Sequence, residues 1–352
     1  MAIRKVCVAM SGGVDSAGAA LLLRQQGYEV FGVTLRLRSA GASDPQEQDI
    51  ADARSVADTL GIPHTVLDLR ELFQREVMDR FVSEYAAGRT PNPCVDCNRC
   101  IKFGALLDWA LDHGADALAT GHYARVGQDE ASGRHLLLRG TDRRKDQSYV
   151  LYQLTQHQLS HLLLPVGSCE KPKLRAMAEQ AGLRNAHRAD SQDICFIPDG
   201  DYVSFLRSYG GVVSVPGDFV DLEGRVLGRH QGLECYTTGQ RKGLGVSAGV
   251  PVYVVRKDLD AGTVVLGPNS ALYTQELTAD RVNLISIDRL EGPLQVTAKT
   301  RYTQQEAEAM VEPLPGGRIR VTFQEPQRAV TAGQAVVLYQ GEAVLGGGTI
   351  CS

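Results

Sequence analysis

The sequence has no hydrophobic run near the roughly 20 residues that a membrane-spanning helix needs. It also contains no internal repeat and no low-complexity tract, so it lacks the features of solenoids and of disordered chains. Residues 1–6 pass directly into a strand-like segment, without the leader pattern of a signal or transit peptide. We therefore expect a cytoplasmic protein that does not associate with membranes.

A strong charge of either sign is also missing, since the formal net charge is -4. That balance argues weakly against a general nucleic-acid binder. Residues 134–188 are different, because they hold ten lysines and arginines against four aspartates and glutamates. Two interpretations remain open: a basic face for phosphates, or an ordinary solvated surface of mixed charge.

The chain of 352 residues is 43% hydrophobic and 22% charged, which is typical of a globular protein, and it is too long for a single core. Its first part alternates strand and helix patterns, which predicts an α/β fold with a doubly wound parallel sheet. The expected strands are residues 5–10, 29–34, 64–68 and 117–119, and the expected helices are residues 15–26, 71–87 and 98–113, with a further helix that begins at residue 43 and is closed by Gly61.

After about residue 209 the sequence changes to glycines between short β-branched runs, which is typical of β-barrels. Residues 318–323 and 335–339 also alternate as strands. We predict three domains: a nucleotide-binding catalytic domain over 1–208, a central β-rich domain over 209–275 and a C-terminal β-barrel over 276–352.

The segment Ser11-Gly12-Gly13-Val14-Asp15-Ser16 lies between a hydrophobic strand and an amphipathic helix. Backbone N–H groups and the helix dipole converge there on an anion, and the glycines let the backbone approach a phosphate closely. The Lys-Ser/Thr pair of a Walker A loop does not follow, which argues against γ-phosphate transfer. The motif resembles the loop of the PP-loop ATP pyrophosphatases, which transfer the α-phosphate as an adenylate.

Eight cysteines in an expected cytosolic chain indicate thiols kept for chemistry or metal binding. Cys94, Cys97 and Cys100 form a group, and Cys195 stands alone between Ile194 and Phe196. The plain alternative for each is a small buried hydrophobic residue.

Several further motifs, in order, closely resemble the bacterial tRNA-specific 2-thiouridylase family, MnmA or TrmU. The resemblance covers nearly the whole chain. The motifs are residues 88–93 (GRTPNP), 97–98 (CN), 101–103 (IKF), 119–123 (ATGHY), 145–149 (KDQSY), 190–191 (DS), 194–197 (ICFI), 239–245 (GQRKGLG) and 346–348 (GGG).

The resemblance implies a PP-loop fold and an ATP-dependent sulfurtransferase. It implies that the enzyme adenylates O2 of the wobble uridine, position 34, in tRNA for Lys, Glu and Gln, with Mg²⁺ on the phosphates, and releases AMP and pyrophosphate. Sulfur then displaces AMP. Cys195 matches the cysteine that carries a persulfide, and Cys97 matches its partner nucleophile, with which it can form a disulfide. Asp15 is expected to support Mg²⁺–phosphate binding.

Further site residues carry over by position. The ATP site is expected at Ala9, Met10, Ser11, Gly12, Gly13, Val14, Asp15, Ser16, Leu35 and Gly121. Leu35 stands where the family usually has an adenine-contacting methionine. The tRNA contacts are expected at Asn92, Pro93, Cys94, His122, Lys145, Asp146, Gln147, Arg301, Tyr302 and Gln334. His122 could instead be a satisfied core histidine, and the Lys145 group an exposed charged loop.

Cys94 departs from the family, where many members have aspartate. Its spacing to Cys97 allows a [4Fe–4S] cluster on Cys94, Cys97 and Cys195, or a zinc site that adds Cys100. Other functions also stay open: another PP-loop synthetase, or a non-catalytic tRNA-binding or sulfur-carrier module. A cysteine desulfurase or a sulfur-relay protein is the expected sulfur donor, and a monomer is the expected state.

Overall fold

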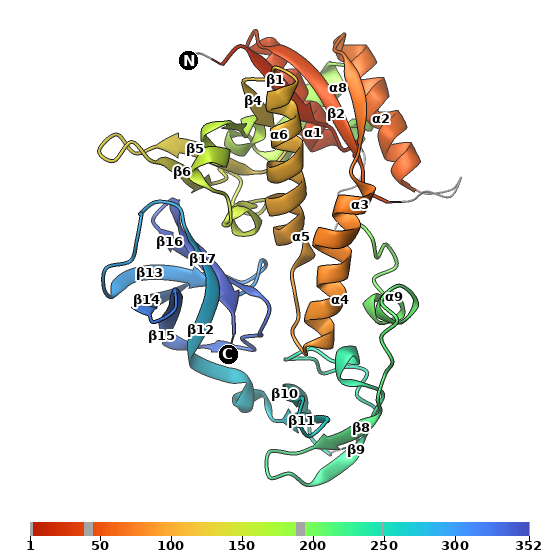
Figure 1. The fold of residues 1–352 in the computed structure, drawn as a ribbon, viewed down its shortest axis with the longest axis vertical. Coiled ribbons are helices and arrows are strands. Elements are labelled where there is room, and N and C mark those ends of the chain that lie inside the picture. The colour runs from red at the N-terminus through yellow and green to blue at the C-terminus, as the bar shows by residue number, and fades with distance from the viewer. Residues whose placement is uncertain (1–2, 39–44, 188–193, 248, 352) are drawn as a thin grey trace.

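The computed structural model describes residues 3–38, 45–187, 194–247 and 249–351. Its strands form a five-stranded, a four-stranded and an eight-stranded sheet. Figure 1 places the first sheet and its helices at the top, the four-stranded sheet at the bottom, and the last sheet between them at the left. The N-terminus and the C-terminus therefore lie in different parts of the molecule.

The first sheet is parallel throughout and has the strand order β3-β2-β1-β4-β7. Side chains alternate between its faces, so that Val6 and Val8 enter one buried cluster while Cys7 and Leu118 enter another. The prediction of a doubly wound α/β sheet is confirmed. The strands are β1 (Lys5–Ala9), β2 (Glu29–Arg36), β3 (His64–Asp68), β4 (Ala117–Ala119) and β7 (Leu162–Leu163).

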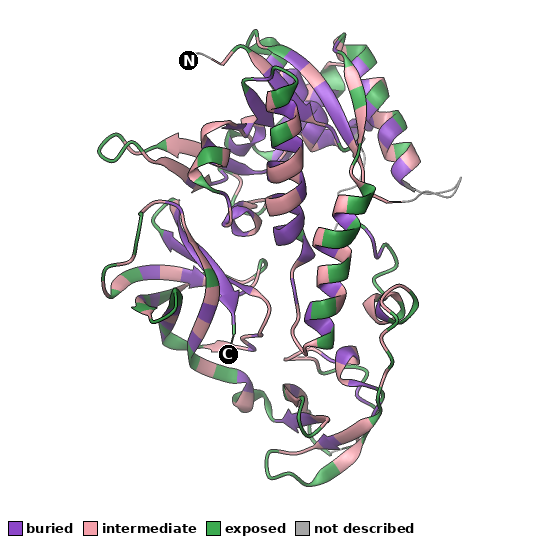
Figure 2. Cartoon of the chain, in the orientation of Figure 1, coloured by how far each residue is buried: buried purple, intermediate pink, exposed green. Residues whose placement is uncertain are grey.

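Helices cover both faces of this sheet, and Figure 2 shows their buried sides turned toward it. Helices α1 and α8 contribute to one cluster, together with α2, and α6 contributes to the other. The helices of this region are α1 (Val14–Gln25), α2 (Pro45–Leu60), α6 (Leu106–Asp112), α7 (Gln156–Ser160), α8 (Lys171–Gln180) and α9 (Tyr202–Ser208).

Two of the expected helices are interrupted by π-helical turns, and the second of them is also longer than predicted. The first runs as α3 (Arg70–Phe73), a π-helix over Gln74–Met78 and α4 (Asp79–Ala86). The second runs as α5 (Pro93–Asp96), a π-helix over Cys97–Ala105 and then α6. It starts at Pro93 instead of residue 98, because Asn92 caps the helix and a proline suits its first turn.

A hairpin of β5 (Ala124–Gln128) and β6 (His135–Arg139) follows β4 and was not predicted. It pairs with β17 through Leu138 and Ala343, so it extends a sheet built mostly from the end of the chain. This pairing joins the first and last parts of the molecule.

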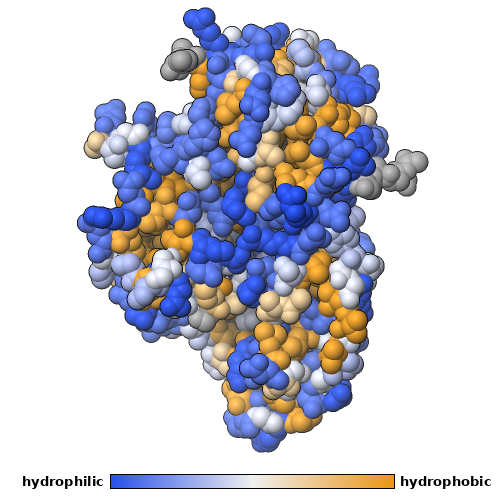
Figure 3. Space-filling model, in the orientation of Figure 1, coloured by the Kyte–Doolittle hydropathy of each residue, from blue (hydrophilic) through white to orange (hydrophobic). Residues whose placement is uncertain are grey.

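The central sheet has the order β10-β11-β8-β9 and packs around Phe219. Most of the strongly exposed large apolar side chains of the described chain belong to this region, including Val213, Val215 and Val250. Figure 3 shows hydrophobic surface over the bottom of the molecule, where this sheet lies. The strands are β8 (Gly217–Val220), β9 (Val226–His230), β10 (Tyr253–Asp258) and β11 (Thr263–Gly267).

The last region is a closed antiparallel barrel of order β12-β15-β14-β13-β16-β17, closed by pairing of β17 with β12. Its interior is apolar, as expected for a small barrel filled by side chains. The boundaries predicted after residues 208 and 275 stay predictions. The strands are β12 (Tyr273–Leu284), β13 (Leu294–Lys299), β14 (Ala307–Leu314), β15 (Arg318–Arg328), β16 (Ala335–Gln340) and β17 (Ala343–Ile350).

Candidate functional site

The loop between β1 and α1 has the geometry of an anion site. Gly12 has a φ of +73°, and a Cβ there would lie 2.5 Å from the Asp49 carbonyl oxygen, so only glycine fits. Ser16 Oγ accepts a hydrogen bond from Ser11 N at 3.1 Å and donates one to Gly13 O at 3.0 Å. No side chain caps α1. Its first N–H groups are therefore available to an anion at the positive end of the helix dipole.

Asp15, in the first turn of α1, forms an ion pair that the sequence did not reveal. Both of its carboxylate oxygens accept hydrogen bonds from Lys171 Nζ at 2.7 Å, and Oδ1 accepts another from Tyr123 OH at 2.8 Å. Lys171 is 6% exposed. It starts α8, and 156 residues separate it from Asp15. No local sequence signal could have linked these two residues.

Gly121 brings the end of β4 against this loop. A Cβ on Gly121 would lie 2.6 Å from Asp15 C and from Ser16 N, so a larger residue would push the two segments apart. Ala9 and Met10 end β1, where Met10 is buried and its N–H donates to Val33 O. Leu35 is half-buried and packs beside the cluster that contains Cys97. The structure thus brings most of the predicted ATP residues to one edge of the sheet.

His122 follows Gly121 and is 8% exposed. Its Nδ1 lies 2.7 Å from Thr120 Oγ1. Burial, followed by the charge of Lys102, holds the pKa of His122 well below its ordinary value. The imidazole is therefore neutral, and its ring lies 5.6 Å from that of Phe103 in the π-helix Cys97–Ala105.

The cysteine helix, residues 92–105, starts at Asn92, whose Oδ1 accepts a hydrogen bond from Cys94 N at 3.1 Å. Pro93 is its buried first residue. Cys94 exposes surface, whereas Cys97 is only 8% exposed. Burial raises the pKa of the Cys97 thiol to about 12, against the opposing charge of Lys102. Burial also raises the pKa of Cys94.

Cys195 reaches the same place from the segment before α9. Its neighbours Phe196 and Ile197 pack in one apolar cluster with Cys97 and Ile101. Besides burial, the charge of Cys195 raises the pKa of Cys97, and the charge of Cys94 raises the pKa of Cys195. Cys195 exposes surface, yet the protein around it raises its pKa. The packing of Phe196 and Ile197 thus places the Cys195 segment against the cysteine helix.

Cys100 packs against the same apolar cluster as Cys97, and burial raises its pKa, while the charges of Arg99, Glu76, Asp96 and Arg80 also act on its thiol. Within the described residues, no group of three or more Cys, His, Asp or Glu side chains has the arrangement of a metal site. The thiols for an iron–sulfur cluster or zinc are thus near one another but not arranged as ligands. All eight cysteines are free thiols.

Several residues predicted to contact tRNA have partners within the protein. Asp146 accepts from Gly140 N and Ser148 Oγ, and Gln147 Oε1 accepts from Tyr123 N. Arg301 Nη2 donates to the carbonyls of Thr238 and Ala329 and to Thr331 Oγ1. Gln334 Nε2 donates to Thr90 O at 2.7 Å. These side chains hold loops in place, while Tyr302 is exposed and Lys145 half-buried.

The basic segment 134–188 is partly neutralised by the barrel. Its arginines form ion pairs with Asp288, Glu306 and Glu342. The cations of these pairs are Arg134, Arg139 and Arg143. Arg188 and the motif at residues 190–191 lie outside the described residues. Part of the excess positive charge of residues 134–188 is therefore paired within the protein, and only the rest is available to phosphates.

Comparisons with protein-family models match the chain in three consecutive parts. Residues 4–199 match a model described as a tRNA methyl transferase HUP domain. Residues 203–268 match a tRNA methyl transferase PRC-barrel domain, and residues 274–350 match an aminomethyltransferase beta-barrel domain. Among the described residues, no helix is both long and apolar enough to cross a membrane.

Curated relatives resemble the chain over its whole length. A tRNA-specific 2-thiouridylase MnmA of Acetivibrio thermocellus is 48% identical over 99% of this chain and 100% of the relative. Proteins of the same name from Heliobacterium modesticaldum and Moorella thermoacetica are each 51% identical, over 98% and 97% of this chain and 92% and 98% of their own lengths.

Proposed function

Because the chain belongs to the tRNA-specific 2-thiouridylase family, we propose that it is an ATP-dependent sulfurtransferase that converts a uridine of tRNA to 2-thiouridine. One observation carries the proposal: the loop of residues 11–16 and the cysteine helix both pack against the residues that follow β4. Gly121 touches Asp15 and Ser16, and the next residue, His122, lies against Phe103 of the cysteine helix. The matching family models are described by methyl transfer, a reaction that needs neither this loop nor paired thiols.

In the first step the uridine oxygen O2 attacks the α-phosphate of ATP and pyrophosphate leaves. The start of α1 binds the phosphates through its N–H groups. Lys171, held by Asp15, which also accepts a hydrogen bond from Tyr123 OH, adds a cation beside this helix end. Mg²⁺, when bound, neutralises phosphate charge. Since Lys171 compensates Asp15, we assign Asp15 to orienting this lysine as well as to supporting Mg²⁺.

In the second step the terminal sulfur of a Cys195 persulfide attacks C2 of the adenylated base, and AMP leaves. The Cys97 thiolate then attacks Cys195 Sγ, which releases the sulfur on the base and leaves a Cys97–Cys195 disulfide. An external thiol reduces this disulfide. Because burial raises the pKa of Cys97, its thiol must lose its proton before it can attack Cys195 Sγ.

A second candidate route uses a [4Fe–4S] cluster on Cys94, Cys97 and Cys195, which would present sulfide on its fourth iron. Cysteine thiolates are the right donors for such a cluster. Their present arrangement is not that of a metal site, so no step is derived through it.

Anaerobic purification with iron and sulfide analysis, followed by a thiolation assay on metal-free protein given a persulfide donor, separates the two routes. We expect metal-free protein to form 2-thiouridine, detected by mass spectrometry of tRNA nucleosides, and Cys195→Ala to abolish it. Activity only after cluster reconstitution, lost also in Cys94→Ala, would reject the persulfide route. No 2-thiouridine under any condition would reject the function itself.

The finer parts of the proposal rest on the family resemblance alone. They are position 34 of tRNA for Lys, Glu and Gln as the target, a cysteine desulfurase or relay protein as the sulfur donor, a cytoplasmic site of action and a monomer. The tRNA contacts listed from the sequence belong to the same proposal.

A further inference from the structure

The barrel holds the entrance of the cysteine helix through main-chain contacts. Thr90 N donates to Ala332 O at 2.9 Å, and Gln334 Nε2 donates to Thr90 O at 2.7 Å. Thr90 lies two residues before the Asn92 cap. The loop before β16 therefore fixes the point from which this helix starts.

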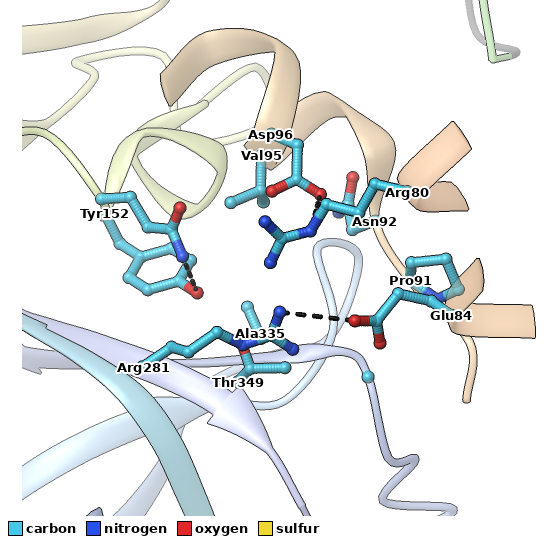
Figure 4. Close-up of a pocket in the computed structure, with 12 residues that line it drawn as sticks. Arg80, Glu84, Pro91, Asn92, Val95, Asp96, Tyr152, Arg281, Ala335 and Thr349 are labelled. Atoms are coloured by element: carbon cyan, nitrogen blue, oxygen red, sulfur yellow. Dashed lines mark hydrogen bonds and ion pairs between the residues drawn. The ribbon is translucent and has the colours of Figure 1, made fainter. Parts of the chain in front are cut away.

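Arg281 makes a second contact, at the cost of an unusual backbone conformation. Its φ is +49°, which is uncommon for a residue with a Cβ. The register of β12 against β17 shifts between Asp280 and Asn283, and such bulges re-aim side chains. Arg281 Nη1 lies 3.4 Å from Glu84 Oε1 on α4 (Figure 4). The strained bulge thus directs a guanidinium out of the barrel and onto α4.

Glu84 is a buried carboxylate that pairs with a second arginine as well. Its side chain is 9% exposed, and it is also paired with Arg89, just beyond α4 and next to Thr90. Although burial opposes ionisation, the guanidiniums of Arg89 and Arg281 hold the pKa of Glu84 below its ordinary value. One buried carboxylate therefore ties the barrel to α4 and to the segment that enters the cysteine helix.

The barrel also supports the far side of the cysteine helix. Asn283 Nδ2 donates to Tyr152 O at 2.8 Å and to Leu154 O at 3.0 Å. Within the same short segment, Val150 O accepts from Asn98 Nδ2 at 3.1 Å. Asn98 directly follows Cys97. Arg281 and Asn283 lie on one barrel strand. Through Glu84, Arg281 supports the segment that enters the cysteine helix, and Asn283 supports the segment that Asn98 contacts just after Cys97.

The hollow at this junction is too small for a ligand. Its free volume is about 20 Å³, with Arg80, Asp96, Asn92 and Arg281 among the residues around it (Figure 4). That volume admits about one water molecule. The charged side chains here are therefore structural contacts between two domains.

We propose that the barrel positions the cysteine helix through Arg281 and Asn283, so that sulfur transfer depends on this contact while adenylation does not. The inference rests on the proposed function. Arg281 and Asn283 are positioning residues, because they act on Cys97 through Glu84, Thr90 and Asn98. The ATP loop has its own supports, Lys171 and Gly121, which do not pass through the barrel.

The test uses Arg281→Asn, which removes the guanidinium but tolerates a positive φ. We expect kcat for thiolation to fall about 10-fold to 100-fold, as for a catalytic group moved by about 1 Å. KM for tRNA and pyrophosphate release per tRNA should stay unchanged. Alkylation of Cys97, followed by peptide mass spectrometry, should become several-fold faster. Arg281→Lys, which keeps the charge, should restore part of kcat.

Arg289→Ala is the matched control, because it removes an exposed barrel ion pair with Glu291. It should behave as wild type. Glu84→Gln tests the contact from the other side and serves if Arg281→Asn does not fold. Unchanged kcat and Cys97 alkylation in both variants would overturn the proposal, as would a raised KM for tRNA with an equal loss of pyrophosphate release. If wild type forms no 2-thiouridine, the proposed function fails. The alkylation rates of Cys97 still test whether Arg281 and Asn283 position the cysteine helix.

Discussion

At the scale of single residues, the ion pair of Asp15 and Lys171 is the main addition that the structure makes to the nucleotide site. Lys171 is nearly fully buried, whereas the Asp15 side chain is 32% exposed. A buried ammonium is stable only with a well-placed carboxylate. The pair therefore places the Lys171 side chain beside the start of α1, where we propose that phosphate binds.

Lys171→Met should lower pyrophosphate release at least about 100-fold, because it removes a preorganised charge at the reacting phosphate. Asp15 would also lose its cationic partner, which should cost about 3 kcal/mol of unfolding free energy. This value is at the low end of the range for a buried ion pair, because Asp15 is partly exposed. Chemical denaturation and a pyrophosphate assay measure the two effects.

The exposed Lys173→Ala, two residues along the same helix, is the control and should change neither quantity. Asp15→Asn with Lys171→Met should recover stability without recovering activity. If Lys171→Met released pyrophosphate at the wild-type rate, the lysine would have no role in adenylation.

At the scale of elements, the π-helix Cys97–Ala105 determines which side chains share a face. Its i→i+5 hydrogen bonding brings residues five apart onto nearly the same side, unlike an α-helix. Lys102 follows Cys97 by five residues, and its charge lowers the pKa of Cys94, Cys97 and Cys195 against the larger effect of burial. An uninterrupted α-helix would turn this lysine away from the thiols.

Asn92 has two candidate roles at the start of the same element: helix cap and tRNA contact. Asn92→Ala should cost about 1 kcal/mol of unfolding free energy and lower kcat for thiolation, because Cys94 N loses its acceptor. Asn92→Ser keeps a capping oxygen and should retain stability and kcat. Denaturation, steady-state kinetics and tRNA binding of both variants measure this.

Asp201→Ala removes the cap of α9 and serves as the control for losing a cap elsewhere. Equal loss of tRNA affinity in Asn92→Ala and Asn92→Ser, with kcat intact, would contradict a capping role and favour the RNA contact.

At the scale of the whole molecule, charge is arranged to join domains as much as to attract RNA. The overall net charge is -4, and three arginines of the basic segment pair with carboxylates from the end of the chain. Such pairs leave fewer cations for phosphates. We therefore expect tRNA to be bound by a few lysines and arginines instead of by a broad basic face.

Lys145→Ala should weaken tRNA binding and reduce the slope of log affinity against log salt by about one, as for one lost phosphate contact. Arg301→Ala should instead destabilise the protein, because its guanidinium holds Thr238, Ala329 and Thr331 together. Binding titrations at several salt concentrations, with thermal unfolding as the second measurement, distinguish the two.

ATP binding should survive in both variants, which makes it the internal control. A salt slope unchanged in Lys145→Ala would place the RNA on another surface. A slope reduced by Arg301→Ala, without loss of stability, would make Arg301 a phosphate contact after all.

The parallel sheet and the phosphate loop could be predicted because their signals are local. Hydrophobic runs of the right length and a glycine pair before α1 place β1, β2 and β3 within a few residues of where they lie. The grouping of Cys94 and Cys97 is visible in the same way. Family motifs predicted Cys195 as their partner, and this pairing stays a prediction, although Phe196 and Cys97 belong to one apolar cluster.

The contacts that complete the site could not be predicted, because they join residues far apart in sequence. Lys171 meets Asp15 only when α8 packs beside α1, and Arg281 meets Glu84 only when the barrel docks on α4. The contact of Gln334 with Thr90 depends on the same docking, and Arg301 meets Thr238 only when the barrel packs beside the central region. By itself, the sequence determined the sheet, the loop and the reactive residue types, since backbone preference and hydrophobic period act over a few residues. Only the tertiary structure decided which charges are already paired and what holds Cys97, because long-range packing determines ion pairing and burial.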